Sequence, residues 1–147
     1  MNDRCNLQSR WTQGLKEFDD AFSVRKEVFI IEQDIDEEIE VDEFDDISWH
    51  LVLYDSGKPV ATGRIFKKAD SFVIGRICVL KEYRGRSIGN LLMELLMERA
   101  NDLGARRLRL DSQLYAIDFY RRFGFREYGE IFLDAGIEHL KMVKEIL

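Results

Sequence analysis

The sequence predicts a single α/β domain (α+β in the order of its elements), with a mixed, mostly antiparallel sheet and a central parallel strand pair, flanked by helices. Apolar, β-branched runs at 49–54, 59–66 and 72–80 are separated by short polar turns, which is typical of an antiparallel meander. An apolar helix and another strand follow the third run, and a crossover of this length makes its two strands parallel. No linker, repeat or low-complexity spacer divides residues 1–147, so we expect one domain.

The composition is that of a folded protein with a sizeable core, since 46% of its residues are hydrophobic and it has one proline. No apolar run reaches the roughly 18–20 residues of a membrane span, and the N-terminus lacks the apolar core of a signal peptide. We therefore expect a cytoplasmic protein without a membrane partner. The net charge of −6 argues against a nucleic-acid partner. Cys5 and Cys78 lack a CxxC pattern, which predicts reduced thiols and no metal site.

The N-terminal region predicts a weak strand at 10–15 and then a helix over about 18–30. Apolar residues in the second stretch recur at helical spacing. Asp19 and Asp20 suit the first turn of a helix, where the macrodipole favours negative charge.

The segment Glu32–Asp46 is unusually acidic, with ten acidic residues among its fifteen. Charge runs are usually solvated, so one interpretation is a surface loop or short helix. The other is an acidic wall that attracts a cationic partner or substrate. A calcium-binding loop is excluded, because Ile39 stands where the glycine is required and Asp45 stands where the closing glutamate is required.

The C-terminal half begins with a helix that ends at Gly104, a residue type favoured just after a helix. Its predicted buried side consists of Ile88, Leu91, Leu92, Leu95, Leu96, Ala100 and Leu103. Alternating residues at 107–111 predict a strand with one buried face, and a short apolar helix then ends at Gly124. Two further strands, at about 126–132 and 138–143, complete the chain.

The loop Tyr83–Asn90 joins a predicted strand to a helix and is rich in arginine and glycine. The first N–H groups of a helix have no internal partners, glycine allows an anion to approach the backbone, and guanidinium groups bind phosphate. These properties predict a phosphate site, and the alternative is a basic surface loop with Ser87 as an ordinary helix cap. Neither a Walker GxxxxGK[ST] motif nor a GxGxxG motif is present.

The run Arg84-Gly85-Arg86-Ser87-Ile88-Gly89 resembles the acyl-CoA pyrophosphate loop, [Q/R]-x-x-G-x-[G/A], of the GNAT acetyltransferase superfamily. Ser87 replaces the first glycine of that pattern, a departure that matters if the backbone there has a positive φ. Phe119–Phe125 resembles the family's FYxxxGF segment. Val24–Phe29 with Glu32-Gln33, and Gly136–His139, resemble a bacterial subgroup of small GNAT proteins of unassigned substrate. The resemblance covers nearly the whole chain.

The resemblance implies a GNAT fold that binds acetyl-CoA where the two parallel strands splay apart. The pantetheine arm would pair, like an added strand, with the backbone around Ile77, Cys78 and Val79. The pyrophosphate would lie on the loop residues Arg84, Gly85, Arg86, Ser87, Ile88, Gly89 and Asn90.

For catalysis, Tyr120 resembles the family tyrosine that hydrogen-bonds or protonates the thiol sulfur. Because tyrosine titrates above a thiol, hydrogen bonding is its expected larger role. The attacking amine must be neutral, and Glu32, His139 and His50 are candidate bases by residue type. His139 is favoured, because its strand should end near the cleft. Ser112 and Gln113 end a strand and are candidates for contact with cofactor or acceptor.

The implied activity is direct transfer of acetyl to a primary amine of a small-molecule or peptidic acceptor, cationic if the acidic wall faces the site. The sequence leaves the oligomeric state open between a monomer and a homodimer, although GNAT proteins similar to this one are often dimers. Two alternatives remain open: a CoA-binding sensor or interaction module with the same fold and no transfer activity, and an anion-binding scaffold unrelated to CoA. Fold analogy does not identify the acceptor.

Overall fold

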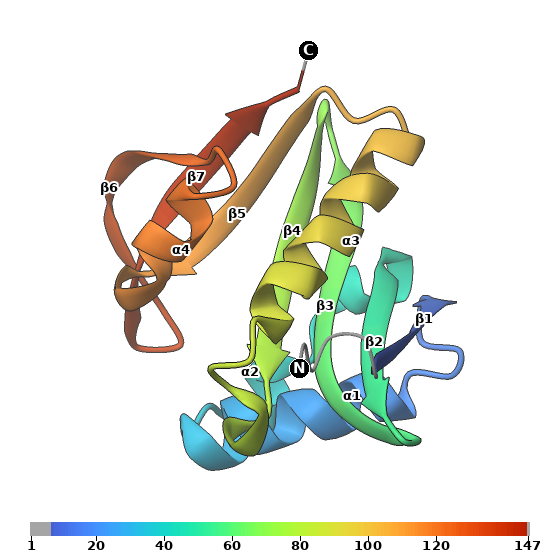
Figure 1. Ribbon diagram of the computed structural model, residues 1–147. Helices are drawn as coiled ribbons and strands as arrows, with labels where there is room; N and C mark the ends of the chain where they lie inside the picture. The colour runs from blue at the N-terminus through green and yellow to red at the C-terminus, as the bar shows by residue number, and fades with distance from the viewer. Residues whose placement is uncertain (1–6, 147) are drawn as a thin grey trace.

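The computed structural model describes residues 7–146, in which the strands form one sheet in the order β1-β2-β3-β4-β5-β7-β6 (Figure 1). Its strands are β1 (Leu7–Gln13), β2 (Trp49–Asp55), β3 (Lys58–Lys68), β4 (Ser71–Val79), β5 (Arg107–Gln113), β6 (Arg126–Asp134) and β7 (Ile137–Glu145). All neighbouring pairs are antiparallel except β4 and β5, which are parallel. The predicted mixed sheet and its parallel pair are confirmed.

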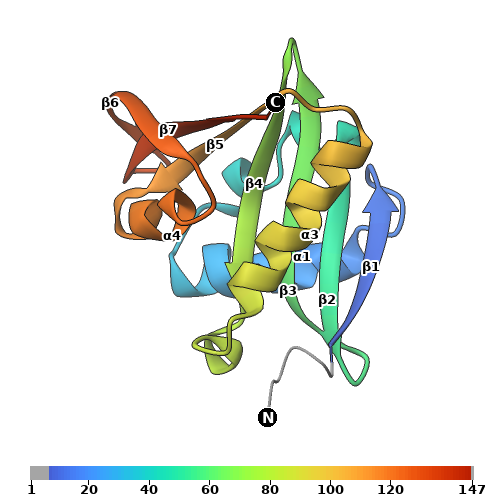
Figure 2. The ribbon, with the colours of Figure 1, turned by 45° about the horizontal axis from the view of Figure 1, so that its top comes forward.

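Helices cover both faces of this sheet, with α3 on one face and α1 and α2 on the other (Figures 1 and 2). They are α1 (Asp19–Arg25), α2 (Glu37–Glu40), α3 (Ile88–Asp102) and α4 (Ile117–Arg121). A π-helical segment (Lys26–Glu32) continues α1 directly, and short 3₁₀ turns lie at Glu43–Ile47, Lys81–Tyr83 and Leu114–Ala116. The helix expected at about 18–30 is confirmed, although its second half is π-helical.

The core is formed by the apolar side of α3 and the strands beneath it. Leu92 and Leu96 of α3 are fully buried, as are Leu51 and Ile65 on β2 and β3. A Cβ at Gly63 would lie 2.9 Å from Cδ1 of Leu96, so glycine is what lets α3 approach β3 this closely.

The two parallel strands stay together over a very short distance. They pair only at Phe72 with Leu108 and at Val73 with Arg109. Beyond this point the register between β3 and β4 shifts, and Arg76 has a φ of +51°. A bulge of this kind bends and twists its strand. We attribute to it the divergence of β4 from β5, which is visible in Figure 1.

The acidic segment Glu32–Asp46 is not the wholly solvated surface element that its charge predicts. The side chains of Glu40 and Asp45 are 1% and 0% exposed, and Arg25 binds both of them. Buried carboxylates persist in proteins when their charge is paired and hydrogen-bonded. The complete cluster, which we call the arginine–carboxylate network, consists of Arg25, Arg64, Arg76, Glu40, Asp42 and Asp45.

The N-terminal strand β1 pairs with β2 from Leu7 to Gln13, slightly earlier in the chain than the expected 10–15. Cys78 is a buried free thiol, whereas Cys5 lies outside the described residues. Within residues 7–146, no helix combines the length and apolar character needed to cross a bilayer.

Candidate active site

A large cleft of about 1330 Å³ passes between β4 and β5, where the strands diverge. Small-molecule pockets commonly measure about 300–1000 Å³, so this cleft has room for an extended ligand or for two ligands. Most of the residues expected at the site line it: Glu32, Ile77, Cys78, Val79, Arg84, Gly85, Ser87, Ile88, Gly89, Asn90, Gln113, Tyr120 and His139.

Three candidate residues are not among those that line the cleft. The Arg86 guanidinium lies 5.0 Å from the centroid of the Tyr83 ring. His50 is buried, with its Nε2 3.0 Å from the backbone oxygen of Asp45, and burial lowers its pKa. The hydroxyl of Ser112 is directed to the neighbouring backbone oxygen at 2.8 Å. His50 and Ser112 therefore bond to neighbouring backbone oxygens and do not line the cleft.

In the loop before α3, Ser87 has a left-handed backbone conformation, which is unfavourable in free energy for a serine. Ser87 has a φ of +61° and forms no side-chain cap to α3. The left-handed region costs a non-glycine residue about 1–2 kcal/mol. The family pattern has glycine at this position, so the departure at Ser87 does matter. Gly85 also has a positive φ, of +79°, and a Cβ there would meet no heavy atom within 4 Å, which leaves the backbone open to a ligand.

Arg84 connects this loop to two other walls of the cleft. Its Nη1 and Nη2 donate to the Glu32 carboxylate at 2.7 and 2.6 Å, and its Nε donates to the backbone oxygen of Val79 at 3.0 Å. The hydrogen bonds from Arg84 hold the pKa of Glu32 below its ordinary value of 4.5. In this state Glu32 is a weaker proton acceptor than a free carboxylate.

The edge of β4 that faces the gap carries backbone groups suited to an extended ligand. The Leu80 N–H donates to Val60 on β3, and successive residues of a strand direct their hydrogen-bonding groups to alternate sides. Val79 and Ile77 therefore face away from β3, as the contact between Val79 and Arg84 also indicates. The Val79 oxygen already accepts from Arg84, so the Val79 N–H and the backbone groups of Ile77 are those available to a linear amide ligand in the gap.

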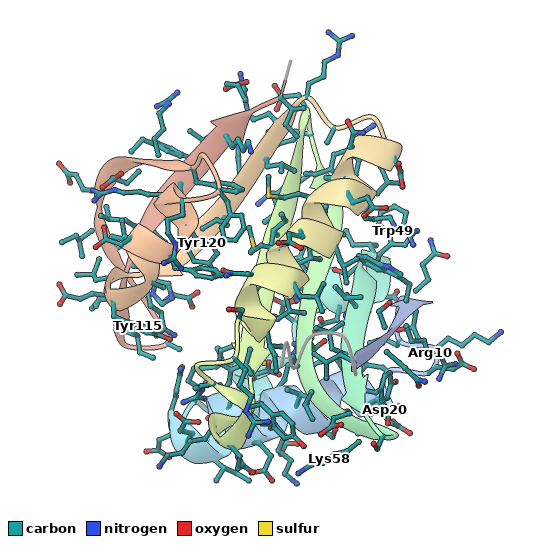
Figure 3. The ribbon with its side chains drawn as sticks, in the orientation of Figure 1. Arg10, Asp20, Trp49, Lys58, Tyr115 and Tyr120 are labelled. Atoms are coloured by element: carbon teal, nitrogen blue, oxygen red, sulfur yellow. The ribbon has the colours of Figure 1, made fainter. Side chains whose placement is uncertain are left out.

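Tyr120 extends from α4 toward the gap (Figure 3). Its ring packs edge-on against Phe119 and Phe125, with centroid distances of 5.0 and 6.4 Å. Burial raises the pKa of Tyr120, so the phenol keeps its proton at neutral pH. No atom within residues 7–146 accepts or donates a hydrogen bond at its hydroxyl, which leaves the O–H free to donate into the cleft.

His139 reaches the cleft from β7, directly opposite Gln113 on β5. Its ring stacks on Phe132 at 5.7 Å, and its Nδ1 lies 2.7 Å from the backbone oxygen of Ile137. A carbonyl only accepts, so Nδ1 carries the hydrogen and the neutral ring presents the lone pair of Nε2. This tautomer allows His139 to accept a proton.

Gln113, a candidate from the sequence, lines the cleft together with charged and aromatic residues that were not singled out as site residues. The Gln113 amide donates to the Gln33 side chain at 3.1 Å, which joins β5 to the end of the π-helical segment. Further charged and aromatic residues line the same side of the cleft: Lys68, Arg109, Asp111, Tyr128, Asp134 and Lys141. In the part of the chain that the structure describes, no group of three or more His, Cys, Asp or Glu side chains is arranged to hold a metal ion.

Comparison with known proteins agrees with this geometry. Residues 13–146 match the family described as "Acetyltransferase (GNAT) domain". The chain is 45% identical over 127 residues to the uncharacterized N-acetyltransferase YjcF of Bacillus subtilis, covering 86% of this chain and 91% of that protein. A crystal structure of an N-acetyltransferase from Lactobacillus plantarum superposes with a TM-score of 0.87, at 27% identity over 96% of this chain and 99% of that one.

A second solved structure, an acyl-CoA N-acyltransferase from Pseudomonas aeruginosa, gives a TM-score of 0.85 at 28% identity, covering 94% of this chain and 99% of its own. The family match spans nearly the whole chain, and the splayed parallel pair, the loop before α3 and the cleft occur together in it. The chain therefore belongs to the GNAT family of acetyltransferases and is an acyltransferase enzyme.

Proposed function

We propose that this enzyme transfers an acetyl group from acetyl-CoA directly to a primary amine of a small-molecule or peptidic acceptor. The observation that carries the proposal is the cleft through the splayed strands, which joins the loop before α3, the free edge of β4 and the Tyr120 hydroxyl. The similarity to a structure named as an acyl-CoA N-acyltransferase supports a CoA-derived donor.

The residues present suit acetyl-CoA. The first N–H groups of α3 and the open backbone at Gly85 would hold the pyrophosphate, with Arg84 and Arg86 adding positive charge. The edge of β4 at Ile77 and Val79 would pair with the pantetheine amides. When bound, the thioester supplies the activated acetyl group.

Tyr120 would act at the departing sulfur, and His139 would act on the proton of the acceptor amine. The Tyr120 hydroxyl donates a hydrogen bond to the departing sulfur, and its raised pKa makes this stabilisation a larger contribution than complete proton transfer. The free Nε2 of His139 takes the proton from the acceptor amine, directly or through water. Glu32 is the alternative base. It would act in this way only after Arg84 has left its carboxylate to bind another anion.

The acceptor need not be cationic. Three arginines balance the three carboxylates of the arginine–carboxylate network, so the acidic segment contributes less negative potential to the cleft than its sequence implies.

Thiol release from acetyl-CoA against polyamines, amino sugars, amino acids and peptides tests the transfer. In the same assay we expect Tyr120→Phe to lower turnover about 10²-fold, with the Kd for CoA changed less than about twofold. Tyr115→Phe is the control, since Tyr115 lies on the rim of the cleft and is 81% exposed.

Unchanged turnover in Tyr120→Phe would refute its role at the sulfur. Binding of CoA without transfer to any amine would favour the sensor alternative, and absence of CoA binding by calorimetry would refute the donor assignment.

A further inference from the structure

Arg109 lines the cleft, and its guanidinium binds two hydroxyl groups in place of a carboxylate. Its Nε donates to the Ser71 hydroxyl at 3.0 Å, and its Nη1 donates to the Tyr128 hydroxyl at 2.9 Å. Both partners are neutral, and no carboxylate within residues 7–146 forms an ion pair with Arg109. By contrast, Arg64 and Arg76, which also line the cleft, both bind carboxylates of the arginine–carboxylate network.

Tyr128 adds a second donor beside this guanidinium. Because its oxygen accepts the hydrogen bond from Arg109, its own O–H remains to donate to another group. Lys141 is the cross-strand neighbour of Tyr128, and it also lines the cleft, with its ammonium 5.8 Å from the Phe132 ring centroid. Three donors, two of them cationic, therefore lie on the same side of the β5–β7–β6 region.

A purely structural role explains this arrangement poorly. Arg109 does link β4 to β6 through Ser71 and Tyr128. A brace between two hydroxyl groups requires hydrogen bonds and no charge, whereas a half-buried guanidinium without a counter-ion carries a desolvation cost. A planar guanidinium with free N–H groups matches the two oxygens of a carboxylate.

The position of Arg109 and Tyr128 relative to His139 limits the shape of a ligand that contacts all three. His139 lies opposite Gln113, and Gln113 is four residues beyond Arg109 on β5. At a rise of roughly 3.3 Å per residue, the two positions are roughly 13 Å apart along the strand. Asp111 lies between them and also lines the cleft. Because side chains of a strand stand roughly perpendicular to the sheet, a ligand that contacts both residues must span several bonds, and an amine next to its own carboxylate is too short.

We propose that Arg109, with Tyr128, binds a carboxylate of the acceptor, and that the acceptor is an amino acid or short peptide whose reacting amine lies several bonds from that carboxylate. The ε-amine of a lysine with a free carboxylate and the N-terminus of a tripeptide have this form. The proposal rests on the proposed acetyl transfer to amines and specifies its substrate class.

The test uses unbranched ω-amino acids, from glycine through aminobutyrate and aminohexanoate to aminooctanoate, and the carboxamide of each. Thiol release from acetyl-CoA gives kcat/KM for every member. We expect the longer acids to exceed their amides by about 10- to 100-fold, the range of a hydrogen bond between charged groups. The shortest acids should show little activity or preference.

Arg109→Gln should bring the ratio of acid to amide close to one while leaving kcat/KM for the amides within about threefold of wild type. Arg107→Gln is the matched control. Arg107 is on the same strand, is paired with Glu145 at 2.9 Å and is not among the residues that line the cleft, so its loss should leave the ratio unchanged. Arg109→Lys keeps the charge without the planar fork, and should retain part of the preference even if Arg109→Gln fails to fold.

Equal kcat/KM values for acids and amides in the wild type would refute carboxylate binding by Arg109, while leaving the proposed acetyl transfer intact. An Arg109→Gln variant that slows acids and amides equally would show that the residue is only a brace. If no amine of these series or of the wider panel releases thiol although CoA binds, the proposed transfer fails and this proposal fails with it.

Discussion

Replacing Asp45 by asparagine tests whether the arginine–carboxylate network holds the acidic segment on the sheet. One oxygen of Asp45 lies 2.7 Å from Arg25 Nη1 and 2.9 Å from Arg64 Nη1. The other lies 2.9 Å from Arg25 Nη2 and accepts from the Asp42 N–H at 3.1 Å. Asparagine keeps the shape, but it loses the charge and directs an NH₂ group toward other donors.

The expected loss of stability follows from charge balance and burial. The side chain of Asp45 is 0% exposed, and its removal leaves three arginines with two carboxylates. Breaking a buried ion pair by removing one partner costs about 3–5 kcal/mol. With a urea m-value of about 2 kcal/mol/M, the midpoint should fall by about 2 M. Asp46→Asn, at the exposed neighbouring residue, should change stability by less than about 0.5 kcal/mol.

The same variant should weaken the dependence of stability on acid. Burial alone would raise the pKa of Asp45, but hydrogen bonds and charge from Arg25 and Arg64 outweigh it and hold the pKa well below the ordinary value of 3.8. A carboxylate with a depressed folded-state pKa stabilises the fold above its unfolded pKa, and this stabilisation is lost as pH falls below it. Between neutral pH and pH of about 3, wild type should therefore lose more stability than Asp45→Asn. A urea midpoint for Asp45→Asn equal to that of wild type at neutral pH would refute this account of the network.

Two smaller changes test the loop before α3. Glu32→Gln should tighten CoA binding by about two- to fivefold in calorimetry, because an exposed ion pair of about 0.5–1 kcal/mol no longer holds Arg84 away from phosphate. Glu37→Gln is the control. Weaker CoA binding in Glu32→Gln would mean that Glu32 positions Arg84 for the phosphate. Ser87→Gly should raise the free energy of unfolding by about 0.5 kcal/mol, because glycine adopts a positive φ without the steric cost. Ser87→Ala keeps that cost and should show no gain in stability. Equal stabilities for the glycine and alanine variants would refute backbone strain at residue 87.

The fold could be predicted largely because its signals are local. The alternation of apolar residues at 107–111 and the helical spacing from Ile88 to Leu103 each lie within one element, and both correspond to the observed β5 and α3. The crossover from β4 to β5 is long enough to contain α3, and this predicted the parallel pair. The loop from Arg84 to Asn90 could likewise be placed, because its position between a strand and a helix is a property of neighbouring residues.

The burial of the acidic residues could not be predicted from their own segment. Their partners, Arg25, Arg64 and Arg76, come from the N-terminal helix and from two strands, up to 36 residues away in the sequence. The same limit applies to Arg109, because its contact with Tyr128 depends on the register of β5, β7 and β6. Long-range pairing of polar groups leaves no periodic signal in a sequence.

The gap between β4 and β5 also determines how two substrates meet. Its lining includes Ser87 and Phe119 on the side of α3 and α4, and Asp42 and Phe44 on the side of α2. The cleft is therefore lined by residues from both faces of the sheet. If acetyl-CoA binds on the α3 side, as proposed, an acceptor that approaches from the α2 side does not displace it, and both are present when the acetyl group moves. Simultaneous binding of this kind would allow the proposed direct transfer within a ternary complex, with no covalent acetyl-enzyme stage.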